Sequence, residues 1–345
     1  MSAEREAIEE FDCFGSRCAA LVIGPGQAGT AHEAAALIRR TLLAWHERFS
    51  RFQAGSELSR LNRDPRETVP VSPLMARFAQ AVREAGTLSG GLVDGTLVGE
   101  LERAGYAGDL REPLALTAAL ALAPARKPAA AAAAGRWRQL EVDLEAGTIT
   151  RPPGLMLDGG GLAKGLFADL LGEALATHAG FAVNCAGDLL VGGAKQIARA
   201  IKVESPFDGR TLHTFELSRT GVATSGIGRR SWRGRDGAPA HHLLDPSSGR
   251  PAFTGVVQVT ALAPSALAAE IYAKAALLSG PQAAHRWLAH GGVIVYDDGS
   301  HEVVTPAPVV TLEQLYATSS RSAARPNAAL SCSVSSAAGS GRAIT

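Results

Sequence analysis

Apolar and polar positions along this chain recur with two periods, one typical of helices and one of strands. Ala31–Phe49 has apolar residues at helical spacing. A second helix is predicted over Pro73–Leu88, because Ser72 is a good N-cap and proline is tolerated at the first helical position. Ala266–Leu278 and Gln282–Ala289 also have helical spacing.

Short apolar or alternating runs predict strands. The first is Phe11–Ile23, and residues 140–149 should form a hairpin with its turn at Glu145–Gly147. Further strands are predicted at residues 182–184, 189–192, 199–204, 213–217, 256–263, 293–296 and 302–304. Runs of short strands with helices between them favour an α+β fold with mixed, largely antiparallel sheets and packed helices over a doubly wound sheet.

The expected organisation is one domain over residues 11–305, after an N-terminal extension of residues 1–10. Residues 112–136 are rich in alanine and proline, which suits a helical excursion or a poorly ordered insertion. Residues 306–345 form a C-terminal tail. From about Thr318 the tail is rich in Ser, Ala, Gly and Arg and has little to bury, so we expect disorder there.

Composition narrows the class of protein. The 345 residues are 46% hydrophobic and 19% charged, which is ordinary for a globular chain, and the net charge of +1 predicts no broad attraction to nucleic acid or anionic lipid. Any phosphate recognition must therefore be local. The four cysteines lack metal-ligand spacing and are interpreted as reduced thiols, with a bridge between Cys13 and Cys18 as the alternative.

The segments that would indicate export or membrane insertion are missing from the sequence pattern. The acidic N-terminus lacks the apolar core of a secretory signal, and no apolar run reaches the roughly 18–20 residues of a membrane span. We expect a cytoplasmic protein.

Asp158–Ala168 is the first candidate for chemistry. Three glycines, Gly159 to Gly161, lead into an apolar helical run, and Lys164 stands in its first turn. Glycines allow close approach of the backbone to a ligand, and a cation opposes the helix dipole unless an anion is nearby. The segment is either a phosphate site or a tight turn with a solvent-facing lysine.

Two further polar segments follow predicted strands. In Asn184–Asp188, backbone N–H groups near Gly187 and the Asn amide can point at a ligand, although these are also ordinary turn residues. The hydroxyls of Thr224 and Ser225 can bind a phosphate or the edge of a flavin ring.

His242–Gly249 is more specific. His242 and Asp245 stand three residues apart beside a proline turn, as a base and its orienting partner would. A metal-ligand pair is a second interpretation, and a third is that Asp245 caps the turn while His242 packs. Since no second histidine stands at metal spacing, a base or flavin contact ranks above a metal ligand.

Glu270 and Lys274 lie four apart on a predicted helix and can form an ion pair. The apolar neighbours Ile271, Ala275 and Leu277 predict a largely buried helix. A buried pair indicates a site or a partner more often than a surface pair does, because desolvation of the charges is costly.

In this order the segments resemble the ApbE-like FAD:protein FMN transferases over roughly residues 11–305. The resemblance is carried by the following six segments: Ser56–Asn62, Asp94–Thr96, Asp158–Gly165, Asn184–Asp188, Thr224–Gly226 and His242–Gly249. It implies an ApbE (T-fold-like) fold that splits FAD at its pyrophosphate and attaches FMN to a Thr or Ser hydroxyl of an acceptor flavoprotein, releasing AMP. It also implies a divalent cation, usually Mg²⁺, on the pyrophosphate.

The resemblance assigns roles to individual positions. The predicted contacts with FAD are Phe14, Phe52, Ser56, Leu92, Val93, Asp94, Asp158, Lys164, Gly187, Asp188, Thr224, Ser225 and Leu243. Gly161, through its carbonyl, and Glu270 match metal-ligand positions, and His242 and Lys274 are the candidate catalytic residues.

One position departs from the family pattern, which has Asp and, four residues on, Thr as metal ligands. Glu270 can replace the aspartate, but the ammonium of Lys274 cannot ligate magnesium and repels it. Metal dependence is therefore the open question, and Lys274 is predicted to occupy the place of one metal charge. An FAD pyrophosphatase and a non-catalytic FAD-binding protein are the alternative functions.

Overall fold

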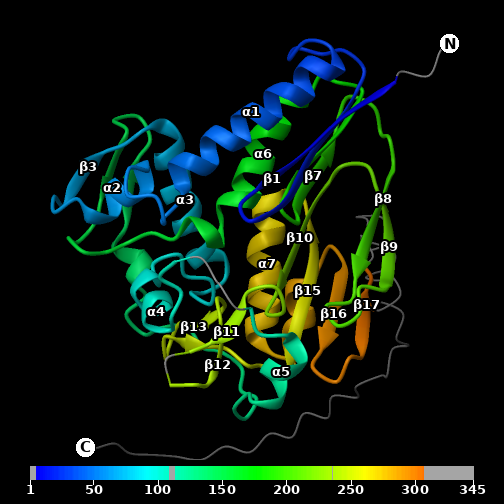
Figure 1. The fold of residues 1–345 in the computed structure, drawn as a ribbon. Helices are drawn as coiled ribbons and strands as arrows, with labels where there is room; N and C mark the ends of the chain where they lie inside the picture. Colours follow the sequence, from blue (N-terminus) through cyan, green and yellow to red (C-terminus); the bar gives the residue numbers. More distant parts are fainter. Residues whose placement is uncertain (1–4, 109–112, 235, 307–345) are drawn as a thin grey trace, which may run out of the picture. The chain divides into compact units, whose positions relative to one another are not determined.

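The central feature of the fold is an antiparallel sheet (Figure 1). The structure is a computed structural model that describes residues 5–108, 113–234 and 236–306, so the tail predicted from residue 306 lies almost entirely outside the described residues. In spatial order the eight strands are β1 (Glu6–Cys13), β2 (Ser16–Ile23), β6 (Gly180–Cys185), β7 (Asp188–Gly192), β10 (Thr220–Gly226), β15 (Val256–Ala263), β16 (Gly292–Tyr296) and β17 (His301–Val304). Every neighbouring pair is antiparallel.

Both faces of this sheet are covered, because side chains alternate between the faces along each strand. On one face, α1 (Ala31–Phe49), α6 (Ala163–Leu175) and α7 (Ala266–Ser279) share one apolar core. The hairpin of β8 (Arg199–Glu204) and β9 (Thr211–Leu217) covers the other face. In β10, Ala223 packs against α7, and the preceding Val222 packs in the cluster that contains strand β9.

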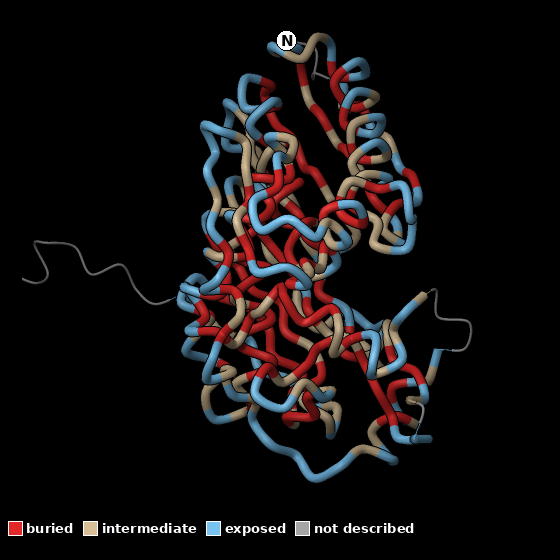
Figure 2. Tube along the Cα trace, turned by 90° about the vertical axis from the view of Figure 1, so that its left-hand side faces the viewer, coloured by how far each residue is buried: buried red, intermediate tan, exposed pale blue. Residues whose placement is uncertain are grey.

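The remaining elements lie outside the central sheet, and all of them except α3 are short. The helices are α2 (Glu57–Arg63), α3 (Pro73–Leu88), α4 (Val98–Arg103) and α5 (Leu116–Ala121), with 3₁₀ turns at Arg136–Gln139, Gly159–Gly161 and Ala284–Trp287. Small sheets form from β3 (Thr68–Pro70), β5 (Thr148–Thr150) and β4 (Glu141–Asp143), from β11 (Ser231–Arg233) with β12 (Pro239–His241), and from β13 (Leu244–Asp245) with β14 (Arg250–Pro251). Figure 2 shows buried residues along the inner elements and exposed residues in the outer loops.

The predicted α+β class and the three long helices are confirmed. Ser72 caps α3 by accepting a hydrogen bond from the backbone N–H of Met75, as its position before Pro73 predicts. Thr30 and Glu33 form a reciprocal capping box at the start of α1. Local capping and helical spacing therefore fix these elements.

The first strand prediction is wrong. Phe11–Ile23 is not a single strand, because Phe14 and Gly15 form a tight turn between β1 and β2 with φ of 56° and 69°. Positive φ at both turn residues matches the twist of a two-residue hairpin. Strand β1 begins at Glu6, so half of the predicted N-terminal extension belongs to the sheet.

Other corrections concern short elements. The polar residues from Phe52 to Asn62 predict a loop, but most of Ser56–Asn62 is helix α2. Thr224–Gly226 lies within β10 instead of following a strand. The helix predicted over Gln282–Ala289 is only the 3₁₀ turn at Ala284–Trp287. Elements this short carry too few apolar repeats for their period to be recognised.

Candidate functional site

A cavity of about 730 Å³ brings most of the predicted site residues together. The predicted residues that line it are Phe14, Phe52, Leu92, Val93, Asp94, Asp158, Gly161, Lys164, His242, Leu243 and Lys274. They come from the β1–β2 turn, the loops after α1 and α3, the start of α6, the loop after β12, and α7. Such a volume is within the range of roughly 300–1,000 Å³ typical of small-molecule sites.

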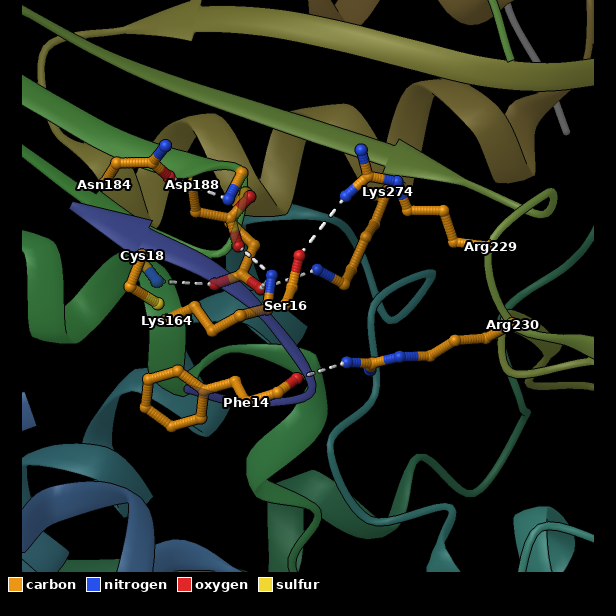
Figure 3. Close-up of polar contacts among 12 residues, drawn as sticks. Phe14, Ser16, Cys18, Lys164, Asn184, Asp188, Arg229, Arg230 and Lys274 are labelled. Atoms are coloured by element: carbon orange, nitrogen blue, oxygen red, sulfur yellow. Dashed lines mark hydrogen bonds and ion pairs between the residues drawn. The ribbon is translucent and has the colours of Figure 1, made fainter. Parts of the chain in front are cut away.

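The β1–β2 turn supplies Phe14. Its ring packs edge-on against His46, with ring centroids 4.9 Å apart, and its carbonyl oxygen accepts a hydrogen bond of 3.1 Å from Arg230 Nη2 (Figure 3). A non-glycine residue with positive φ is uncommon and is found most often where the surrounding structure enforces it. The turn therefore holds Phe14 at the cavity in a fixed orientation.

The glycine segment before α6 is a 3₁₀ turn capped by Asp158, whose carboxylate accepts from the N–H of Gly160 at 3.3 Å. Asp158 also lies 3.5 Å from Arg51 Nε. Gly165 allows close approach of α6 to α7, since a Cβ there would lie 2.7 Å from the carbonyl oxygen of Ala266.

Lys164 does not point to solvent. Its ammonium donates a hydrogen bond to Asp188 Oδ2 and lies 3.5 Å from Glu270 Oε1. The same Glu270 oxygen accepts from Lys274 Nζ at 2.9 Å, and Glu270 Oε2 accepts from the backbone N–H of Gly165 at 2.9 Å. Two ammonium groups and two carboxylates thus form one buried cluster at the contact of α6, α7 and β7 (Figure 3).

The environment shifts the pKa values in this charged cluster in opposite directions. Burial opposes the ionised form of Glu270, but Lys274 and then Lys164 outweigh it and lower its pKa to about 2. The pKa of Lys164 is raised because Asp188 and Glu270 outweigh the effect of burial. Burial and the nearby Glu270 raise the pKa of Asp188, against the opposing effect of Lys164. Glu270 is the firmly ionised carboxylate to which both lysines are bound.

Magnesium does not fit this cluster. Both oxygens of Glu270 are engaged, and the ammonium of Lys274 stands where a second ligand would be needed. Mg²⁺ requires oxygen ligands in near-octahedral geometry, which an ammonium cannot supply. Among the described residues, no group of three or more His, Cys, Asp or Glu side chains is placed to hold a metal ion.

His242 lines the cavity, and its Nδ1 is buried without a hydrogen-bond partner in the described chain. Burial, followed by Arg230, His241 and Lys274, holds the pKa of His242 well below its usual range, so the imidazole is neutral. Asp245 does not orient it, because its carboxylate instead accepts from Ala130, Ser247 and Ser248. The interpretation of Asp245 as a turn cap is therefore confirmed.

Several predicted contacts with the cofactor lie outside the cavity lining. Ser56 caps α2 by accepting from the N–H of Ser59 at 3.0 Å, and the N–H of Gly187 is used within its own turn by Asn184 Oδ1. Asp188 is buried beneath Lys164. The position of none of these three favours a direct contact.

The hydroxyls on β10 are also placed differently from the prediction. Thr224 pairs across the sheet with Thr260, with the two hydroxyl oxygens 2.8 Å apart. Ser225 is buried in the same strand, and neither residue is among those that line the cavity. Glu270 likewise does not line the cavity, but it accepts a hydrogen bond from Lys274, which does.

Among the cavity residues that were not predicted from the sequence, Arg51, Tyr106, Arg229 and Arg230 have polar groups suited to a ligand. The guanidinium carbon of Arg51 lies 4.5 Å from the ring centroids of both Phe52 and Tyr106. Arg229 donates to Ser16 Oγ at 3.4 Å. The adjacent Arg229 and Arg230 follow a strand with polar residues, and two neighbouring cations could have been recognised in the sequence as a local phosphate-binding segment. Nothing local distinguishes Arg51 or Tyr106.

The cysteines and the helices bear on two further expectations, reduced thiols and the absence of a membrane span. Cys13, Cys18 and Cys185 are buried free thiols, which agrees with the reduced interpretation, and Cys332 lies outside the described residues. Within the described ranges, no helix is both long and apolar enough to cross a bilayer.

The class of protein follows from comparison with known families. Residues 14–296 match the ApbE family, so the chain belongs to that family. Two solved structures share the fold. The ApbE protein of Thermotoga maritima has a TM-score of 0.68 and 23% identity, and the match covers 87% of this chain and 97% of that chain. The flavin transferase ApbE of Vibrio cholerae has a TM-score of 0.67 and 20% identity, and the match covers 88% of this chain and 98% of that chain.

Curated relatives carry a more particular name. The chain is 27% identical over 235 residues to the FAD:protein FMN transferase of Salmonella typhimurium, covering 66% of this chain and 65% of that protein. It is 31% identical over 162 residues to the protein of the same name from Treponema pallidum, covering 41% and 44%. These alignments therefore span less than two thirds of the length of either relative.

Proposed function

We propose that this chain transfers FMN from FAD to a Thr or Ser hydroxyl of an acceptor protein and releases AMP. Membership of the ApbE family and the names of the relatives support this activity. The observation that carries it is the composition of the cavity, which combines aromatic side chains for ring systems with cations for a diphosphate. The cytoplasmic location stays a prediction.

Charge in the cavity favours an anionic ligand. Among the described residues that line it, five side chains are cationic, Arg51, Lys164, Arg229, Arg230 and Lys274, and two are carboxylates, Asp94 and Asp158. Arg51 and Asp158 face each other at 3.5 Å. The remaining cations suit the two negative charges of the FAD diphosphate, since charge-assisted hydrogen bonds to phosphate are stronger than neutral ones.

The transfer is a displacement at phosphorus. The acceptor hydroxyl oxygen attacks the phosphorus that belongs to the FMN half, and the bond from that phosphorus to the bridging oxygen breaks. AMP leaves with the electron pair of the broken bond, and one phosphoester bond replaces one phosphoanhydride bond. We assign the hydroxyl proton to His242, which lines the cavity and is neutral.

The test uses purified protein, FAD and the apo form of a flavoprotein that has a threonine-linked FMN site. Covalent flavin on the acceptor by mass spectrometry, with one AMP formed per flavin, is the expected result. Free FMN and AMP without acceptor labelling would identify an FAD pyrophosphatase. Intact FAD that remains bound would identify a non-catalytic flavin-binding protein.

A further inference from the structure

We propose that Lys274, together with Lys164 and Arg230, binds the diphosphate of the flavin substrate in place of a divalent cation, so that substrate binding needs no metal. This inference rests on the proposed function only for the identity of the substrate. It is carried by the arrangement of Lys164, Lys274, Asp188 and Glu270 and by the two arginines beside it.

The first argument is that Oε1 of Glu270 is already shared by two ammonium groups and that Oε2 already accepts a backbone hydrogen bond. Lys274 Nζ at 2.9 Å and Lys164 Nζ at 3.5 Å share Oε1, and the N–H of Gly165 occupies Oε2 at 2.9 Å. A dication here would have to displace an ammonium group and remain next to the other one. At such separations repulsion between like charges is large in a buried site.

The second argument is charge balance. Lys164 and Lys274 are matched by Asp188 and Glu270 within the buried cluster. Arg229 and Arg230 bind only neutral oxygens, those of Ser16 and Phe14, and no carboxylate in the described part of the chain lies within ion-pairing distance of either. Arg229 and Arg230 therefore supply two positive charges that no carboxylate contacts directly. Even with the carboxylate of Asp94 on the lining, the cavity keeps a net positive charge, which favours a diphosphate diester.

The third argument is geometric. Only 8% of the surface of Lys274 is exposed, yet the residue lines the cavity, as do Lys164 and Arg230. An ammonium has three donors, and the contact with Glu270 uses one of them. The other donors can bind phosphate oxygen while Glu270 holds the ammonium in place. A lysine of this kind acts as a compact point charge.

The experiment measures FAD affinity by fluorescence anisotropy in EDTA and in excess Mg²⁺. The native protein should bind FAD equally in both buffers. Lys274→Thr, which removes the charge and introduces an oxygen ligand, should bind about 10–100-fold more weakly in EDTA and regain affinity in Mg²⁺. Lys202→Thr, an exposed position on β8, is the matched control and should behave as the native protein does.

A second readout keeps the inference testable if Lys274→Thr does not fold. Electron paramagnetic resonance of Mn²⁺ should show no protein-bound Mn²⁺ in the native protein, with or without FAD. Native FAD affinity that is lost in EDTA and restored by Mg²⁺, or stoichiometric Mn²⁺ binding, would overturn the inference. Failure of the native protein to bind FAD in either buffer would contradict the proposed function instead.

Discussion

Lys274 Nζ lies 2.9 Å from Glu270 Oε1, one turn away on the buried helix α7. On an exposed helix such a pair contributes about 0.2–0.5 kcal/mol. Here both side chains are buried, and Lys164 from α6 approaches the same carboxylate at 3.5 Å. The pair is therefore part of a cluster of charged side chains that joins α6 and α7 at the wall of the cavity.

His242→Ala should lower turnover by about 10²–10⁴-fold while FAD affinity is retained, because proton transfer by a positioned group contributes that much. Single-turnover kinetics and anisotropy measure the two quantities separately. His32→Ala, exposed on α1, is the control. An equal loss of binding and turnover would make His242 a flavin contact, and unchanged kinetics would remove it from the site.

Asp188→Asn should destabilise the fold by about 1–3 kcal/mol, because it removes the charged hydrogen-bond partner of Lys164 and leaves Glu270 to balance two lysines. Urea unfolding measures the change. FAD should raise the melting temperature of the variant more than that of the native protein, since the diphosphate replaces the lost charge. Asp208→Asn, in an exposed pair with Arg210, should leave the stability nearly unchanged.

Gly165→Ala should destabilise the protein by about 1–3 kcal/mol, although alanine is normally the better helix former. The added Cβ would meet backbone atoms of Ala266 and Leu267 at 2.7–2.9 Å and force α6 away from α7. Gly99→Ala in α4 is the matched control, because its Cβ would lie 3.5 Å from a flexible Arg103 side chain. Equal stability changes in the two variants would show that the helix crossing is not tight.

Because His241 is buried in its neutral form, we expect the protein to lose stability in acid. Burial lowers the pKa of its imidazole from 6.5 to about 3, so the folded state binds fewer protons than the unfolded chain below pH 6.5. The stability present above pH 6.5 is therefore lost progressively as pH falls toward 3, by on the order of 2 kcal/mol between pH 7 and 5.

His241→Phe should reduce this pH dependence, because phenylalanine fills the space beside Phe253 without titrating. The part that remains comes from His242, whose pKa is also lowered by burial. Urea unfolding at the two pH values is the measurement. His301→Gln, exposed on β17, should lose as much stability between the two pH values as the native protein does. If His241→Phe also loses as much, protonation of His241 is not the cause.

Local sequence determined the long helices and most of the segments that form the cavity. Capping at Ser72 and helical spacing over Ala31–Phe49 are properties of neighbouring residues, so they could be read without the fold. The short strands β11 to β14 and helix α2 could not, because two to seven residues contain too little periodicity. The missed Phe14–Gly15 turn had the same cause, since only the structure shows its positive φ angles.

Which charges meet was decided by the tertiary structure alone. The sequence pairs Glu270 with Lys274 because they are one turn apart, but Lys164 reaches the same carboxylate only because α6 crosses α7 at Gly165. Asp188 reaches Lys164 from a neighbouring strand, so its predicted contact with the cofactor became a buried ion pair. Periodicity and capping act between residues a few positions apart, whereas burial and electrostatics act between residues that are close in space.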